Sequence, residues 1–90
     1  MAEVTVVLIN PLGLHARAAA KIVNVVNRTQ AEITINRPST NKSAHASSIL
    51  GLLELGAKYG STLVIQSDQD DDDGALCEVV DLINNGFGEI

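Results

Sequence analysis

Alternation of hydrophobic and polar positions predicts four β-strands along the chain. In the segment Ala31–Asn36 it is strict, so Ile33 and Ile35 should face a core while Glu32 and Thr34 face solvent. The strands end at turn-forming residues, and most are rich in β-branched side chains. The predicted strands are Glu3–Ile9, Ala31–Asn36, Lys42–Ala46 and Ser61–Ser67. The turn "RPSTN" joins the second and third of them, which should form a hairpin.

Three further segments are predicted to be helices. Between Ala16 and Arg28, and again near the end of the chain, apolar residues recur at positions i, i+3, i+4 and i+7 and mark a face that must be buried. These residues are Ala19, Ile22, Val23 and Val26 in the first helix, and Leu76, Val79, Val80 and Ile83 in the last. A shorter helix is predicted from Ser47 to about Leu55, with Gly56 ending it in a left-handed conformation. Asp71–Asp73 should lie at the N-terminal end of the last helix, and Gly86 at its C-terminal stop.

The resulting order, β-α-β-β-α-β-α, predicts the fold class α+β. No internal repeat, linker or low-complexity insert interrupts it. The simplest arrangement is an open-faced β-sandwich, in which a four-stranded, mostly antiparallel sheet is covered on one face by three helices. We expect one domain that spans residues 1–90.

Composition limits the partners that such a domain could bind. The formal charge is -5, but five acids lie between Asp68 and Asp73, and the remaining acids balance the lysines and arginines. With Tyr59 and Phe87 as its aromatic residues, the chain offers neither a basic face nor a stacking platform, so we expect no nucleic-acid partner. It also shows no basic amphipathic helix, membrane span or signal-peptide core. We therefore expect a soluble, cytoplasmic protein that does not bind membranes.

Three features could indicate thiol chemistry or metal binding, but the sequence around each of them argues against it. Cys77 lies in an apolar helical pattern, so we expect it to be a small buried residue. The run "DQDDDDG" fails as a calcium loop, because Gly74 at the sixth loop position places Gln69 and Val80 where ligands are required. His45 has no ligand cluster at metal spacing and should be a structural or surface residue. We expect no metal and no cofactor, and no ATP site because no glycine-rich nucleotide loop opens a helix.

The candidate site lies in "NPLGLHARAAAKIV", where a loop becomes a helix. If the helix begins at Ala16, His15 is at the cap position, and the first-turn amides, that of Ala16 among them, have no helical acceptor. These donors and the positive end of the helix dipole form a site for an anion. Arg17 adds a permanent charge and a fork of donors suited to phosphate oxygens. A neutral His15 imidazole is a competent nucleophile, and the positive charge around it should keep it neutral near pH 7.

Spacing by itself leaves two interpretations of His15 open. The cap could be left open for a phosphoryl group that the histidine carries. A loop histidine before a helix is, however, more often only a polar surface residue, and Gly13 could do no more than supply a left-handed turn.

The string "NPLGLHAR", followed further along by "SSILGLLELG", resembles the histidine-containing phosphocarrier (HPr) family of the bacterial phosphoenolpyruvate-dependent sugar phosphotransferase system. The resemblance covers essentially the whole chain and implies the open-faced sandwich. It also implies that Nδ1 of His15 takes a phosphoryl group from enzyme I and passes it to sugar-specific IIA proteins or domains, while Arg17 positions the group. Such a protein is a stoichiometric carrier and not an enzyme. Family members usually have proline where this chain has Ala18, which leaves one more amide donor at the helix start.

The short helix in "SSILGLLELG" has almost no polar side, so part of its apolar surface should be exposed unless the helix is unusually buried. The resemblance places Leu52 and Leu55 in the core. It assigns a docking patch for enzyme I and IIA partners to Ile49, Leu50 and Leu53, together with Ala20 and Lys21 of the first helix. Basic positions of the family's docking face are here Asn24, Asn27 and Gly51, which leaves Lys21 and Arg28. We therefore expect weak electrostatic steering toward its partners. We also expect the protein to be a monomer.

Ser48 matches a serine that HPr kinase/phosphorylase modifies in many Gram-positive relatives, and a phosphate there would place negative charge in the docking patch. An N-cap role for Ser47 or Ser48 explains the residue as well. Other functions thus stay open. One is an effector that binds a catabolite-control transcription factor once Ser48 is phosphorylated, although the retained His15 argues against a purely regulatory protein. The others are a relay in a nitrogen-related or dihydroxyacetone-kinase branch, and a small α/β adaptor.

Overall fold

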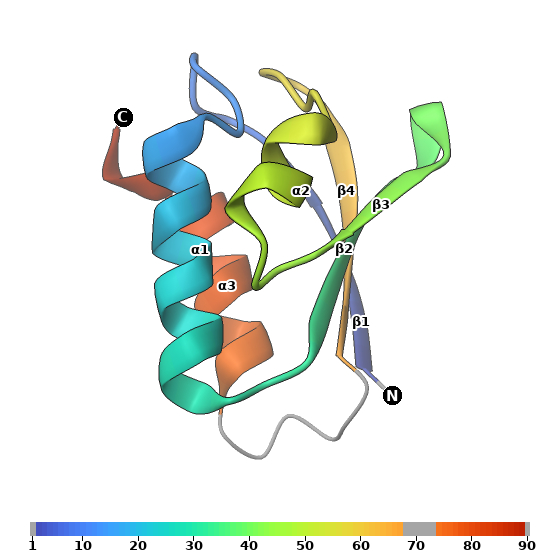
Figure 1. The fold of residues 1–90 in the computed structure, drawn as a ribbon. Helices are drawn as coiled ribbons and strands as arrows, with labels where there is room; N and C mark the ends of the chain where they lie inside the picture. The colour runs from blue at the N-terminus through green and yellow to red at the C-terminus, as the bar shows by residue number, and fades with distance from the viewer. Residues whose placement is uncertain (1, 68–73, 90) are drawn as a thin grey trace.

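The computed structural model describes residues 2–67 and 74–89, and its helices all lie on one face of the sheet (Figure 1). The described elements follow the predicted order, and the predicted fold class is confirmed. The strands are β1 (Ala2–Val7), β2 (Ile33–Arg37), β3 (Lys42–His45) and β4 (Thr62–Ser67). The helices are α1 (Ala16–Thr29), α2 (Ile49–Glu54) and α3 (Ala75–Asn84), and short 3-10 turns occupy Pro38–Thr40 and Gly86–Gly88.

The sheet has the order β1-β4-β2-β3, and each neighbouring pair of strands is antiparallel. The register places Ile65 opposite both Val4 and Ile35, and Ile35 opposite Ala44. Residues opposite one another project to the same face of a sheet, so this row forms the apolar side that the helices cover. Ile33 and Ile35 are buried as predicted, while Glu32 is exposed and Thr34 half-buried.

The helices bury the faces that their spacing predicts. On α1 the predicted residues are all buried, Ala18 is also fully buried, and the helix packs against α2 and α3. On α3, Leu76, Val79 and Ile83 are buried, whereas Val80 is only partly covered. The side chain of Phe87, beyond α3, is among the largest fully buried groups and anchors the end of the chain in the core.

The prediction for Cys77 was wrong, because the cysteine is exposed. It follows Leu76 and precedes Val79 on a helix whose buried face those two residues define. A rotation of about 100° per residue turns position 77 away from that face. The acidic cluster Asp71–Asp73, predicted at the start of α3, lies outside the described residues.

Element ends differ from the predictions by one or two residues. β1 ends at Val7, but Leu8 still pairs with the two residues that precede β4. Its amide donates to the carbonyl of Ser61 at 2.9 Å, and its carbonyl accepts from the amide of Gly60 at 2.8 Å. Gly56 has the predicted left-handed conformation after α2, with φ +62. There, Nη1 of Arg37 donates to the carbonyls of Leu55 and Gly56 at 2.9 and 3.2 Å, which ties the hairpin to the end of α2. Among the described helices, none is long and apolar enough to cross a membrane.

Candidate functional site

The loop before α1 is fixed by its contacts with the loop before β4. The amide of Leu14 donates to the carbonyl of Ala57 at 3.0 Å, and Leu14 itself is buried. Gly13 has φ +66, and a Cβ atom there would lie 2.7 Å from the same carbonyl oxygen. Glycine is therefore required here both for its conformation and for its lack of a side chain. These contacts set where α1 begins and so where His15 lies.

His15 is the N-cap of α1, as predicted, with extended backbone angles (φ -97, ψ 179). Its carbonyl accepts the first helical hydrogen bond from Ala19 at 2.8 Å, and its ring nitrogen Nδ1 accepts from the backbone amide of Arg17 at 3.2 Å. The cap is thus closed by the imidazole, which corrects the prediction of an open cap. The amides of Ala16 and Ala18, also in the first turn, have no helical acceptor.

The second ring nitrogen of His15, Nε2, contacts a carboxylate oxygen of Glu89, close to the other end of the chain. The second oxygen of Glu89 accepts a 2.9 Å hydrogen bond from Nδ2 of Asn10. Because Nδ1 accepts a hydrogen bond from the Arg17 amide, the proton of the neutral ring is on Nε2, which donates to Glu89. Both ring nitrogens therefore have defined roles in the unmodified protein.

The surroundings of Glu89 favour its charged form. The pKa of its carboxyl is lowered from the ordinary value of 4.5, first by the hydrogen bond from Asn10. The hydrogen bond from His15 and the charge of Arg17 lower it further, while desolvation raises it. The carboxylate therefore accepts from both neighbours at neutral pH.

The end of the chain is folded so that Glu89 reaches the start of α1 (Figure 1). Gly86, Phe87 and Gly88 all have positive φ angles, which reverse the chain after α3. The buried Phe87 ring anchors this segment, and Nζ of Lys21 donates to the Phe87 carbonyl at 2.6 Å. Sequence reasoning missed Glu89 because the contact spans almost the whole chain, and only the glycines around Phe87 signalled a reversal.

Arg17 is exposed beside this arrangement and lines a groove of about 460 Å³. Its guanidinium donates no hydrogen bond to the part of the chain that the structure describes. The groove residues are Pro11, Leu12, Arg17, Lys21, Phe87, Gly88 and Glu89. The arginine is thus available to an anion at this end of α1. Nothing in the structure explains why Ala18 stands where the family usually has proline.

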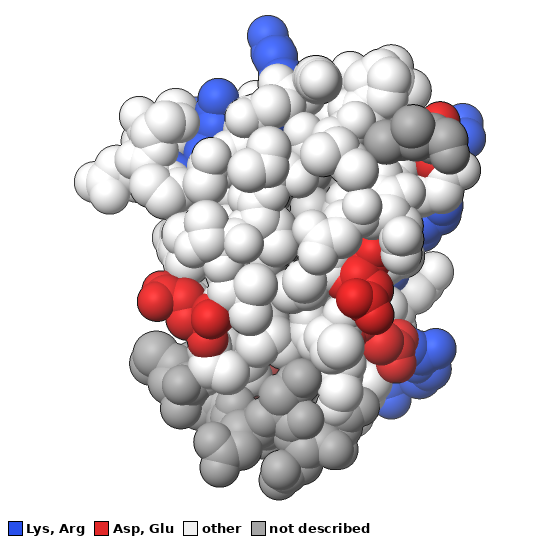
Figure 2. Space-filling model, turned by 180° about the vertical axis from the view of Figure 1, so that it is seen from behind, with Lys and Arg blue, Asp and Glu red and all other residues white. Residues whose placement is uncertain are grey.

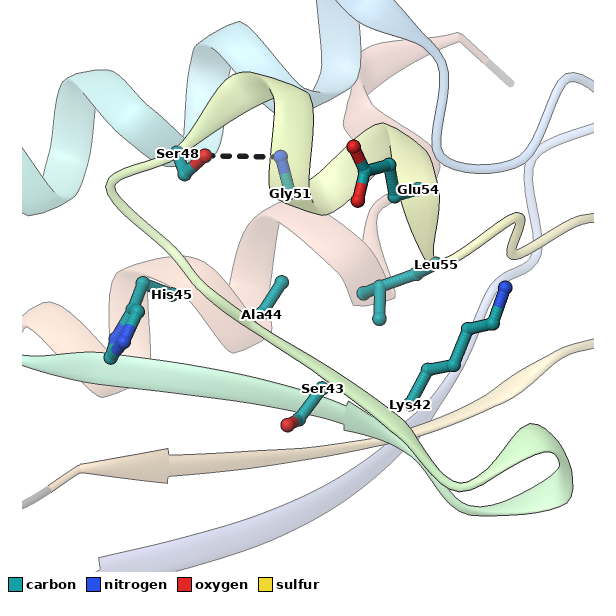
Figure 3. Close-up of a pocket in the computed structure, with 8 residues that line it drawn as sticks. All are labelled: Lys42, Ser43, Ala44, His45, Ser48, Gly51, Glu54 and Leu55. Atoms are coloured by element: carbon teal, nitrogen blue, oxygen red, sulfur yellow. Dashed lines mark hydrogen bonds between the residues drawn. The ribbon is translucent and has the colours of Figure 1, made fainter.

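Ser48 lies at a different place, in a groove of about 440 Å³ between β3 and α2 (Figure 3). Its Oγ accepts a 3.0 Å hydrogen bond from the amide of Gly51, so Ser48, and not Ser47, is the N-cap of α2. Figure 3 shows Glu54 at the far end of α2 and exposed His45 on β3. This groove shares no lining residue with the groove at Arg17. The cap explains Ser48 structurally, and its phosphorylation stays a prediction.

The apolar residues of α2 divide into buried and exposed ones as the family resemblance implies. Leu52 and Leu55 are buried, whereas Leu50 is 70% and Ile49 41% exposed, and Leu53 is partly covered by the core. Ala20 and Lys21 are half-buried on α1, which packs against α2. Leu12 in the loop before α1 is also 70% exposed. An unpartnered apolar surface therefore lies on the helix next to the one that His15 caps.

The two basic residues expected near the apolar surface of α1 and α2 are both engaged in contacts within the chain. Of the two basic residues expected to steer partners, Lys21 donates to the Phe87 carbonyl and Arg28 pairs with Glu78. Figure 2 shows the opposite side of the molecule from Figure 1, where lysines and arginines lie at the margins and uncharged atoms lie between two groups of acids. In residues 2–67 and 74–89, no three His, Cys, Asp or Glu side chains could together hold a metal ion.

Comparisons with known proteins agree with this geometry. A family model described as the PTS HPr component phosphorylation site matches residues 2–85. A phosphocarrier protein HPr of Pseudomonas aeruginosa is 37% identical over 89 residues, which cover 99% of this chain and 98% of the relative. A phosphocarrier protein NPr of Shewanella violacea is 40% identical over 87 residues, which cover 97% and 93%. The crystal structure of an HPr from Thermoanaerobacter tengcongensis superposes with a TM-score of 0.88 at 37% identity, covering 100% and 99% of the two chains.

Proposed function

The chain belongs to the HPr family of phosphocarrier proteins, and from this membership we propose that His15 accepts a phosphoryl group from phosphorylated enzyme I. The group is then passed to IIA proteins or domains of the sugar phosphotransferase system. The observation that carries the proposal is the pair of contacts on the imidazole. They leave the lone pair on Nδ1 and the proton on Nε2, which is the form of the ring that can attack phosphorus through Nδ1.

The start of α1 supplies donors for the transferred group. When Nδ1 bonds to phosphorus, it can no longer accept from the Arg17 amide, so this amide becomes available to a phosphoryl oxygen. The amides of Ala16 and Ala18 and the guanidinium of Arg17 lie in the same helical turn. Amides at a helix N-terminus together with an arginine are well suited to hold a doubly charged group. The bond from phosphorus to the donor breaks as the bond to Nδ1 forms. The protein then holds the group until an acceptor takes it, so it is a stoichiometric carrier and not a catalyst.

The apolar surface beside the site fits a protein that meets several partners briefly. Ile49 and Leu50 are exposed on α2, and Leu53, Ala20 and Lys21 lie partly exposed on the two adjoining helices. We assign to them the docking of enzyme I and of the IIA acceptor. Because Lys21 and Arg28 are engaged within the chain, binding should depend more on apolar contact than on salt.

The proposal is tested by incubating the protein with phosphoenolpyruvate and enzyme I and following the label. The wild type should acquire an acid-labile, alkali-stable phosphate, and His15→Ala should acquire none. The matched control is His45→Ala, which removes the other, exposed histidine and should be labelled like the wild type. Absence of label in the wild type, with an enzyme I that labels another HPr, would exclude the carrier function.

A second candidate is a carrier of the NPr type, because the NPr of Shewanella violacea is as similar as the HPr relatives are. The chemistry at His15 would be the same, and the phosphoryl donor would differ. Competition between a sugar-branch enzyme I and a nitrogen-branch enzyme I for the same protein distinguishes the two functions. The donor with the higher kcat/KM identifies the branch.

A further inference from the structure

Glu89 is held against His15 by an arrangement that occupies both of its oxygens. One oxygen contacts Nε2 of His15, and the other accepts from Nδ2 of Asn10. Asn10 is completely buried, and its Nδ2 also donates to the carbonyl of Gly13 at 2.7 Å. Its Oδ1 is buried and has no hydrogen-bond partner among the described residues. An unpaired buried acceptor carries a free-energy cost. Asn10 nevertheless keeps this orientation, in which both of these side-chain hydrogen bonds are donated by Nδ2.

We propose that Glu89 is a positioning residue for phosphoryl transfer, which keeps the proton on Nε2 of His15 while the phosphoryl group enters and leaves at Nδ1. This inference rests on the proposed function and adds to it a residue and a role. It concerns the nitrogen that does not carry the phosphoryl group, so Glu89 and the incoming group approach opposite sides of the ring.

The charges explain what the carboxylate contributes. A neutral imidazole that attacks phosphorus through Nδ1 forms an N–P bond and becomes a positively charged ring that still bears hydrogen on Nε2. The negative charge of Glu89 favours this charged ring over its deprotonated form. On transfer to the acceptor, the N–P bond breaks, its electron pair returns to Nδ1, and neutral imidazole leaves. If the Nε2 proton were lost first, the leaving group would be an imidazolate anion, which is a much poorer one.

The position of the pair supports this role. The side chains of His15 and Glu89 are 22% and 15% exposed, so water has limited access to the shared proton. The lowered pKa of Glu89 keeps it a carboxylate at neutral pH. Arg17 and Lys21 are the cations that line the same groove. Both side chains are donors without an acceptor atom, so neither could accept from Nε2 in place of Glu89. Lys21 is in addition held by the Phe87 carbonyl.

Glu89→Gln is the informative variant, because the amide has no negative charge and has an NH2 donor in place of one of the two oxygens that Asn10 and His15 contact. The control is Glu32→Gln, the same chemical change at an exposed acid before β2. Imidazole proton and nitrogen NMR should show a slowly exchanging Nε2 proton in the wild type and Glu32→Gln, before and after phosphorylation, and should lose it in Glu89→Gln. Transfer from enzyme I should slow about five- to tenfold in Glu89→Gln, as expected for a partly exposed charge-assisted hydrogen bond.

The outcomes separate this inference from the proposed function. If the wild type is not labelled, the carrier function itself fails. If it is labelled, but Glu89→Gln keeps the Nε2 proton signal and the wild-type transfer rate, the carrier function stands and the role of Glu89 is overturned. Amide spectra of the backbone identify a variant that has lost its fold. In that case Glu89→Asp, which shortens the side chain but keeps the charge, should show a weakened Nε2 signal and an intermediate rate, and wild-type values for both would overturn the proposal.

Discussion

The ammonium group of Lys21 donates a 2.6 Å hydrogen bond to the carbonyl of Phe87, and this bond joins the middle of α1 to the chain segment that carries Glu89. The lysine therefore has a structural partner in its own chain. The HPr family resemblance assigns Lys21 to the docking patch, but in the structure its ammonium group also holds the end of the chain against α1.

Lys21→Met should lower the free energy of unfolding by about 0.5–1.5 kcal/mol, the usual contribution of one such hydrogen bond. Methionine keeps the apolar stem and removes the donor. Urea unfolding measures the change, and Lys42→Met, an exposed lysine on β3, is the control that should change stability little. A stability equal to that of the control would mean that the bond to Phe87 contributes nothing in solution.

Gly13→Ala should destabilise the protein much more than Gly60→Ala. Both glycines have positive φ angles, so each alanine is strained by about 1–2 kcal/mol. At Gly60 no atom in the described part of the chain lies within 4 Å of an added Cβ, whereas at Gly13 the Cβ would lie 2.7 Å from the Ala57 carbonyl oxygen and backbone must move. We expect a further cost of about 1–3 kcal/mol at Gly13, measured by urea unfolding. Equal costs for the two variants would contradict the close contact between the loops.

Leu50→Ser should leave the fold stable but weaken the interaction with enzyme I. The side chain is 70% exposed, so its removal should change stability by no more than about 0.5 kcal/mol. If it docks partners, KM for enzyme I should rise about tenfold, the change typical of losing an apolar anchor. The control is Val7→Ser on β1, which is 44% exposed and outside α1 and α2. An unchanged KM for Leu50→Ser would remove this residue from the docking patch.

Ser48→Ala should lower stability by about 1 kcal/mol, since it removes the N-cap of α2, whereas Ser47→Ala should have almost no effect. Thermal unfolding of the two variants compares neighbouring serines in one experiment. Incubation with ATP and an HPr kinase then tests regulation separately, because only a modified Ser48 would lose its label in Ser48→Ala. A larger loss of stability in Ser47→Ala would show that the cap is assigned to the wrong residue.

The contribution of Glu89 to stability should be lost in acid. Its pKa in the folded protein is below the ordinary value of 4.5, mainly because Asn10 donates to it. Folding therefore favours the carboxylate: the stabilisation is fully present above pH 4.5 and disappears as the pH falls through the lowered value. The difference in free energy of unfolding between the wild type and Glu89→Gln should thus be larger at about pH 5 than at about pH 3. A difference that stays constant over this range would contradict the shift.

Much of the fold follows from local pattern. The strict alternation around Ile33 and Ile35 identifies a strand with one buried face, and the spacing of Ile22 and Val26 identifies the buried face of α1. Those signals depend on neighbours within one or two turns, so a sequence contains them in full. The division of α2 into buried Leu52 and exposed Leu50 came from the family resemblance, because an all-apolar helix carries no internal signal of its buried side.

The parts of the site that the sequence does not reveal depend on distant or atomic relationships. Glu89 contacts His15 only because Phe87 and Lys21 fix the end of the chain, and no periodic pattern records such a contact. The closed cap depends on the rotation of one imidazole ring. Cys77 was misplaced because apolar composition was considered without its angle around the helix axis.

If His15 carries a phosphoryl group as proposed, the hydrogen bond between its Nδ1 and the Arg17 amide means that the empty and the loaded protein cannot present the same surface. One lone pair cannot both accept from the amide and bond to phosphorus. Loading would exchange a flat imidazole edge at the tip of α1 for a doubly charged group that takes over the cap, with no movement required of the core. A donor could thus recognise the empty form and an acceptor the loaded form through the same few atoms.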